Sequence, residues 1–274
     1  MLPLHHSAIL LITKKTISQY KPLYNNIVPQ NIKKTISEKF GKYLKLRYNC
    51  FMNQDNNEEK IEEEIKLKKV QDEFKNGLET IHKFNPSVTF YGSTRLNEGN
   101  QYYEKTRNLA YRISKELNYA VFSGGGPGIM EASNRGAKEA GGKSVGLTIK
   151  LPHEQYTNPY VTDEIPFNFF FTRQSTMSYA TEACIFCPGG YGTLSELFDI
   201  LTLKQTNKIG QVPIILYCSE FWKPIEDTIK AVLLEKFKTI EEKDLALYKI
   251  IDSEDEVLEI VKNSKMRTGE DALD

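Results

Sequence analysis

The sequence is poor in cysteine and tryptophan and has no long apolar segment. Its 274 residues include four Cys and one Trp, and 36 Lys plus Arg balance 36 Asp plus Glu, so the formal net charge is zero. Few cysteines without a disulfide pattern indicate a reducing compartment. No apolar run approaches the roughly 20 residues of a membrane-spanning helix. A neutral chain gives no reason to expect a nucleic-acid or membrane partner.

Cysteine and histidine form no metal-binding pattern, so the sequence predicts no metal site. Cys184 and Cys187 have C-x-x-C spacing, which is typical of redox and zinc sites. Both fall in one expected strand, however, where residues three apart point to opposite faces of a sheet. We therefore expect apolar packing for both side chains. The histidines are scattered at positions 5, 6, 82 and 153.

Strand-like and helical runs alternate from Ser87 to about Ser264. Strands are expected at 87–92, 119–123, 144–149, 183–187, 212–217 and 248–251. Helices are expected at about 101–117, 128–140, 173–181, 193–206, 220–237 and 254–263. This alternation predicts an α/β fold, a doubly wound parallel sheet with helices on both faces.

The first 85 residues differ from this domain. Residues 1–50 carry nine Lys or Arg against a single acid, Glu38, whereas residues 55–80 are acid-rich with apolar residues at helical spacing. We expect a basic extension over 1–54, an amphipathic helix within 55–85, the domain over 86–265 and a tail over 266–274. We expect a cytoplasmic protein in which this basic start is a lysine-rich tail. The alternative is a mitochondrial or other organellar transit peptide, which a basic, acid-poor start resembles.

The segment Pro188–Glu196 predicts a phosphate site. It follows the apolar run 183–187 and consists of a glycine turn and a helix start. A helix N-terminus presents unpaired N–H groups and a positive partial charge, and glycines let the backbone approach an anion closely. Glu196 lies one turn into the helix, so we expect it to serve another part of the same ligand. The alternative for Glu196 is a carboxylate that merely complements the helix dipole.

Two further strands end in small residues. The run 119–122 leads into Ser123–Gly128, and the run 88–91 leads into Gly92 and Ser93. Glycine turns at the carboxyl ends of parallel strands are expected where a ligand binds. The triple-glycine turn is not a dinucleotide fingerprint, because Ile129 replaces its last glycine. The run 142–144 leads into an expected strand, whereas an ATP-binding loop leads into a helix, so this run is not such a loop. Neither glycine motif contains a lysine that could form a Schiff base with pyridoxal phosphate.

Six segments together resemble the LOG family, the cytokinin riboside 5′-monophosphate phosphoribohydrolases, over about residues 86–222. They are Tyr91–Ser93, Gly124–Ala132, Leu151–Gln155, Asn158–Val161, Phe170–Arg173 and Pro188–Glu196. The resemblance implies a Rossmann-like fold and hydrolysis of nucleoside 5′-monophosphates, of the cytokinin riboside or AMP type, to free base and ribose 5-phosphate. It further implies no cofactor, and assembly into homodimers or larger homo-oligomers.

The resemblance also assigns site residues. It places the catalytic pair at Arg173 and Glu196. It implies substrate contacts in the phosphate-binding turn, at Gly189, Gly190, Tyr191, Gly192 and Thr193. It also implies contacts at Glu154 and Thr202. With the other two glycine turns, the expected substrate site also includes Gly92, Ser93, Gly125 and Gly126. Gln174 stands where the family usually has lysine, and we include it among the substrate-binding positions.

The residue types fit this chemistry independently. Cleavage of a ribosyl C–N bond passes through an oxocarbenium-like state, which a carboxylate stabilises. An arginine binds phosphate or the departing base. Because Gln174 removes one positive charge, a nucleotide-binding protein without turnover is the alternative function. The aromatic run Phe167–Phe171 is expected either to line the base or to pack in the core or between subunits.

Overall fold

A computed structural model describes residues 60–150 and 156–265. The basic extension over 1–54 and the tail over 266–274 lie outside the described residues, and so does the segment considered as an alternative targeting peptide. Glu154, an expected substrate contact, also lies outside them. Of the helices in the described part of the chain, none combines the length and apolar composition of a membrane-spanning segment.

In the described part of the chain, seven parallel strands form one sheet in the order β4-β3-β2-β1-β5-β6-β7. Adjacent strands pair in parallel throughout, for example with Tyr91 of β1 opposite Phe186 of β5. The expected α/β fold with a parallel sheet is therefore confirmed. The strands are β1 (Ser87–Tyr91), β2 (Ala120–Ser123), β3 (Ser144–Ile149), β4 (Asp163–Phe167), β5 (Ala183–Phe186), β6 (Ile214–Tyr217) and β7 (Lys249–Ile251).

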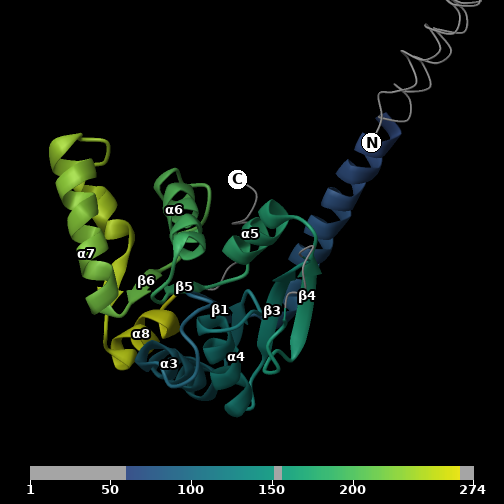
Figure 1. Ribbon diagram of the computed structural model, residues 1–274, viewed down its shortest axis with the longest axis horizontal. Helices are drawn as coiled ribbons and strands as arrows, with labels where there is room; N and C mark the ends of the chain where they lie inside the picture. The colour runs from purple at the N-terminus through teal and green to yellow at the C-terminus, as the bar shows by residue number, and fades with distance from the viewer. Residues whose placement is uncertain (1–59, 151–155, 266–274) are drawn as a thin grey trace, which may run out of the picture. The chain divides into compact units, whose positions relative to one another are not determined.

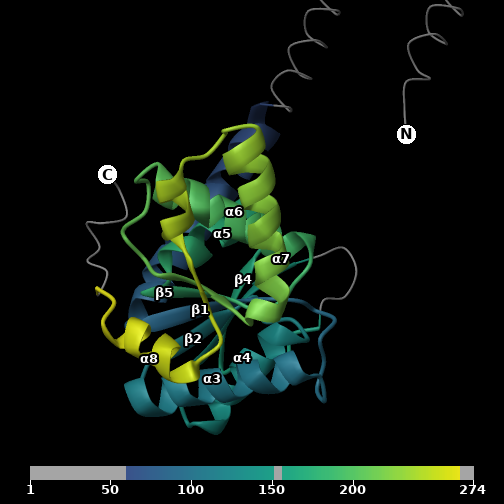
Figure 2. The same ribbon diagram turned by 90° about the vertical axis from the view of Figure 1, so that its left-hand side faces the viewer.

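Helices cover both faces of the sheet, as Figures 1 and 2 show. They are α3 (Gln101–Leu117), α4 (Ile129–Glu139), α5 (Phe170–Tyr179), α6 (Tyr191–Gln205), α7 (Ser219–Ile229) and α8 (Glu254–Lys262). On one face α3, α4 and α8 enclose a core that includes Ile113, Ile129 and Val257. On the other, α5, α6 and α7 contribute Met177, Leu197 and Trp222 to a second core. Cys184 lies in the second core and Cys187 in the first, which confirms that they point to opposite faces of the sheet.

The helix over residues 60–81 precedes β1. The chain divides into two units between Lys66 and Leu67, so this helix is shared between them. In the second unit Ile81 is buried, Leu78 is half-buried and Leu67 is exposed. The apolar stripe expected along this helix is therefore buried only toward its carboxyl end.

Two elements differ from the expectation. The edge strand β4 was not expected, because Asp163, Glu164 and Pro166 interrupt its apolar residues. An edge strand tolerates proline, since one side of its backbone needs no partner in the sheet. The helix expected over 220–237 is divided, because α7 ends at Ile229 and a π-helical segment, Lys230–Lys236, follows.

The strand order reverses at β1. The chain builds β2, β3 and β4 on one side of β1 and then crosses to build β5, β6 and β7 on the other. The glycine turns that follow β1, β2 and β5 therefore meet at one edge of the sheet. In open α/β sheets the crevice at such a reversal, outside the carboxyl ends of the strands, is where ligands bind.

Candidate active site

The turn between β5 and α6 forms the open start of a helix. Gly190 is the N-cap residue of α6 and provides no capping side chain, and the first turn contains no acidic residue. The first N–H groups of the helix are therefore available to an anion. A Cβ atom at Gly190 or Gly192 would meet no atom within 4 Å, whereas one at Gly189 would lie 2.2 Å from the Thr193 hydroxyl. Gly189 thus packs against buried Thr193, while Tyr191 is 94% exposed.

Arg173 and Glu196 meet beside this turn. Nη1 of Arg173 lies 3.8 Å from Oε1 of Glu196, and their side chains are only 11% and 21% exposed. Arg173 comes from the first turn of α5 and Glu196 from the second turn of α6. Two residues from different helices thus form a shielded ion pair at the edge where the glycine turns gather. The structure brings together the two residues expected as the catalytic pair, and Arg173 is shielded rather than solvated.

Backbone atoms of the sheet hold the Arg173 guanidinium. Its Nε donates a hydrogen bond of 2.6 Å to the carbonyl of Leu147, at the carboxyl end of β3. A Cβ atom at Gly124 would lie 2.2 Å from Nη2 of Arg173 and 2.6 Å from the sulfur of Met130. The guanidinium therefore occupies space that only a glycine at position 124 leaves open.

Burial shifts the ionisation of both groups. It lowers the pKa of Arg173, against the opposing effects of Glu196 and Tyr91. The guanidinium still remains charged, because arginine ionises far above neutral pH. Burial raises the pKa of Glu196 to about 7, although the positive charge of Arg173 opposes the shift. A carboxyl group that titrates near neutrality is typical of acid–base catalysis.

The glycine turn after β2 is fixed by buried amides. Asn158 Nδ2 lies 3.1 Å and 3.0 Å from the carbonyls of Gly125 and Gly126, and 2.9 Å from Oδ1 of Asn134. Ser123 links Asn134 to the N–H of Gly125, with distances of 2.7 Å and 3.0 Å. Buried hydrogen-bond networks of this kind rigidify the backbone they hold. The role of Asn158 was missed by the sequence reasoning, although the residue lies in one of the six recognised segments.

The turn after β1 connects the other two. The N–H of Ser93 donates to the carbonyl of Pro188 at 3.0 Å, and the carbonyl of Ser93 accepts from Ile129 at 2.9 Å. A Cβ atom at Gly92 would lie 2.3 Å from the Ile129 side chain. Gly92 and Ser93 therefore join the start of α4 to the turn before α6.

The structure places the remaining expected positions, Gln174, Thr202 and the aromatic run, in different surroundings. Gln174 follows Arg173 on α5 and is half-buried. Thr202 is exposed, and its hydroxyl donates to the carbonyl of Phe198 on its own helix at 2.7 Å. At six residues beyond Glu196, it lies about 9 Å farther along the helix axis, so the structure does not bring it to the pair. Of the aromatic run, Phe167 is fully buried, whereas Phe170 is 60% exposed.

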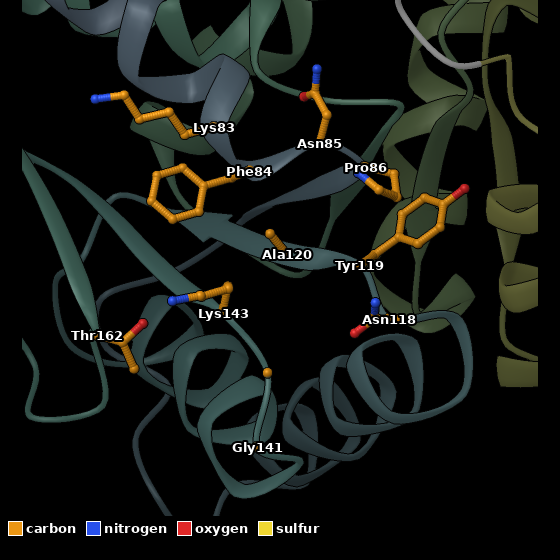
Figure 3. A pocket seen from close by; sticks show the side chains of 11 residues that line it. Lys83, Phe84, Asn85, Pro86, Asn118, Tyr119, Ala120, Gly141, Lys143 and Thr162 are labelled. Atoms are coloured by element: carbon orange, nitrogen blue, oxygen red, sulfur yellow. The ribbon is translucent and has the colours of Figure 1, made fainter.

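A cavity of about 430 Å³ lies at the opposite edge of the sheet. Figure 3 shows Phe84 and Tyr119 among its lining residues, near the amino ends of β1 and β2, with Lys143 before β3. Helices α3 and α4 end beside it, and helix carboxyl ends disfavour anions. It therefore does not belong to the phosphate site. Within 60–150 and 156–265, no group of three or more His, Cys, Asp or Glu side chains is placed to hold a metal ion.

The chain is similar to several known proteins. Residues 130–261 match the family model described as "Possible lysine decarboxylase". The chain is 27% identical over 128 residues to the cytokinin riboside 5′-monophosphate phosphoribohydrolase LOG2 of Arabidopsis thaliana, covering 46% of this chain and 60% of that protein. It is 24% identical over 160 residues to the cytokinin riboside 5′-monophosphate phosphoribohydrolase of Rhodococcoides fascians, covering 56% of this chain and 78% of the relative.

Among solved structures, the chain is similar to the molybdenum cofactor carrier protein of Chlamydomonas reinhardtii, with 18% identity and a TM-score of 0.49, over 65% of this chain and 95% of that one. The resemblance to the LOG family that the glycine motifs indicate is confirmed by the family model and by its phosphoribohydrolase relatives.

Proposed function

We propose that this protein hydrolyses the N-glycosidic bond of nucleoside 5′-monophosphates, releasing the free base and ribose 5-phosphate. The observation that carries the proposal is the shielded pair of Arg173 and Glu196, 3.8 Å apart, beside the open start of α6. Glu196 supplies a negative charge for the cation that develops on the ribose. Arg173 supplies a positive charge for the phosphate or the departing base. The similarity to cytokinin riboside 5′-monophosphate phosphoribohydrolases supports the same reaction class.

The ionised Glu196 carboxylate is the group that acts on the ribose. As the bond from C1′ to the base nitrogen breaks, its electron pair leaves with the base and positive charge develops on C1′ and the ring oxygen. A carboxylate in a shielded site stabilises that charge and orients the attacking water. The water oxygen bonds to C1′, one of its protons is released, and the departing base gains a proton.

The phosphate is the anchor of the substrate. The first N–H groups of α6 bind its oxygens, and Arg173 adds a fixed planar charge for the phosphate or the departing base. The acidic Glu196 lies past the first turn, so it faces the ribose rather than the phosphate. The substrate is thus held at one end and cleaved at the other.

Comparing AMP with adenosine tests this anchor. The release of adenine from AMP should exceed that from adenosine about tenfold to a hundredfold, because one charge-assisted contact contributes about 1.5–3 kcal/mol. A panel of other monophosphates, including a cytokinin riboside 5′-monophosphate, then identifies the preferred base. Comparable rates with AMP and adenosine would contradict a phosphate-anchored mechanism.

A nucleotide-binding protein without turnover is the second candidate. The observation that favours it is Gln174, a neutral residue beside Arg173 at the position where the LOG family usually has lysine. Calorimetric binding of AMP together with undetectable release of adenine would support the binding protein and reject the hydrolase.

We also propose that the protein works as a homodimer or a larger homo-oligomer. The first turn of α5 exposes Phe170 and Phe171, at 60% and 57%, in the same turn as the shielded Arg173. Light scattering should give a mass at least twice the 31.4 kDa of one chain. The double variant Phe170→Ser, Phe171→Ser should shift the protein toward monomer. A strictly monomeric parent protein with full turnover would contradict this proposal.

A further inference from the structure

The start of α5 has no cap of its own. Its N-cap residue is Phe169, which offers no side-chain hydrogen bond, and its first turn contains no acidic residue. This helix nevertheless carries Arg173, whose backbone N–H makes an early intrahelical bond to the Phe169 carbonyl at 3.2 Å. The position of the guanidinium therefore depends on how the residues before α5 are held.

Glu73, on the helix that precedes β1, provides the missing cap. Its Oε2 accepts from both the backbone N–H and the side-chain amide of Asn168, each at 2.7 Å. Its Oε1 accepts from the N–H of Phe169 at 3.2 Å and from the hydroxyl of Thr172 at 2.5 Å. One carboxylate thus binds the last residues before α5 and the third residue within it.

The electrostatics favour this arrangement. A negative charge at a helix N-terminus interacts favourably with the helix dipole. Burial raises the pKa of Glu73, but the hydrogen bonds from Thr172, Asn168 and Phe169 outweigh it and leave the pKa below its usual value. The ionised carboxylate is therefore the form that the fold stabilises.

Close packing brings the two helices together. Gly77 lies one turn beyond Glu73 and is buried. A Cβ atom there would lie 3.0 Å from both the Phe167 ring and the Thr176 hydroxyl. The helix bearing Glu73 is therefore seated directly against β4 and α5, where a side chain at position 77 would force the elements apart.

We propose that Glu73 is a positioning residue that sets the place of Arg173 by capping α5 from another helix. The inference rests on the proposed function, since Arg173 is taken to bind the anionic part of the nucleotide. Glu73 itself touches no expected substrate group. It acts through the turn at residues 168–169, so its loss shifts or loosens the helix that carries the guanidinium.

The test compares Glu73→Ala with Glu79→Ala. Glu79 is on the same helix, and its exposed side chain pairs only loosely with Lys75, at 3.8 Å. Glu73→Ala should weaken ribose 5-phosphate binding about tenfold and speed amide hydrogen exchange over residues 168–176. Glu73→Gln, which retains one acceptor oxygen, should fall between Glu73→Ala and the parent protein. Glu79→Ala should change neither quantity.

A double-mutant cycle separates positioning from general stability. In an Arg173→Ala background, Glu73→Ala should cause no further loss of ribose 5-phosphate affinity, because its effect passes through the missing guanidinium. An equal loss in both backgrounds, or unchanged exchange over 168–176, would overturn the inference. Absence of turnover in the parent protein would contradict the proposed hydrolase, while the binding and exchange measurements would still decide the role of Glu73.

Discussion

The starts of α5 and α6 lie at the same edge of the sheet but are completed in opposite ways. At α5, Glu73 supplies a carboxylate that accepts hydrogen bonds from Asn168, Phe169 and Thr172. At α6, the N-cap Gly190 supplies no side chain and the first turn has no acid. A helix start that is already paired with a carboxylate cannot bind a phosphate well, whereas an open one can.

Glu73 and Glu196, the carboxylates near these two helix starts, also differ in the direction in which their pKa is shifted. Hydrogen bonds to Glu73 overcome its burial and keep its pKa low. Glu196 has one cation 3.8 Å away, and burial raises its pKa to about 7. Environments that push two carboxyl groups apart in pKa separate structural from chemical roles. The difference agrees with the two proposed roles, in which Glu73 positions α5 and Glu196 acts on the substrate.

Removing the charge of Glu196 should have the largest effect. Glu196→Gln keeps the shape but loses the charge that favours the oxocarbenium-like state, so kcat should fall by about 10²- to 10³-fold. The dissociation constant for ribose 5-phosphate should stay within about threefold. The control is Asp199→Asn on the same helix, where the side chain is exposed. Steady-state kinetics and calorimetry measure both quantities, and an unchanged kcat would reject Glu196 as a catalyst.

Giving α6 an acid at its start should convert it into a helix start like that of α5. Position 192 has room for a side chain. Gly192→Asp should weaken ribose 5-phosphate binding about tenfold to a hundredfold, because the carboxylate competes for the N–H groups and repels the anion. Gly192→Asn is the matched neutral control and should lose much less affinity. Equal losses for Asp and Asn would show that charge at this turn does not matter.

The pH dependence should follow Glu196 rather than Glu73. With a pKa of about 7 for Glu196, its reactive ionised form is a minor species at pH 6 and the main one at pH 8. The value of kcat/KM should therefore rise about tenfold over that interval and then level off. Glu73 is ionised throughout, since its pKa lies below the usual value. A flat profile between pH 6 and pH 8 in the parent protein would contradict the proposed role of Glu196.

The smallest effect is expected at Gln174. Gln174→Lys adds a positive charge beside Arg173 and should raise kcat/KM about twofold to fivefold, since a partly exposed charge contributes up to about 1 kcal/mol. Gln174→Met, which changes the side chain without adding charge, is the control. A decrease for the lysine variant with no change for methionine would show that the neutral residue is preferred here.

Most of the fold follows from local sequence patterns, and the long-range contacts do not. Strand ends and glycine turns are local features, so β1, β2 and β5 and their loops could be predicted from the order of residue types. The edge strand β4 could not, because Pro166 and two acids hide it. The burial of Arg173 was equally inaccessible, since a cation at a helix start is ordinarily solvated and only the sheet and α6 enclose it.

The cap that Glu73 provides for α5 could not be predicted from the sequence either. Within its own helix this residue is one of several acids, and nothing local in the sequence separates it from exposed neighbours such as Asp72 and Glu79. Its partners lie about a hundred residues farther along the chain. No spacing rule connects them, because the contact exists only once the helix over 60–81 is packed beside α5.

The glycine at position 124 has an evolutionary consequence. Since any Cβ atom there would collide with the Arg173 guanidinium, a related chain that acquires a larger residue at this position must lose or redirect the arginine. The two positions are therefore expected to change together during divergence, although they are distant in sequence. Such paired change would distinguish relatives that retain the arginine-dependent chemistry from those that have kept only the scaffold.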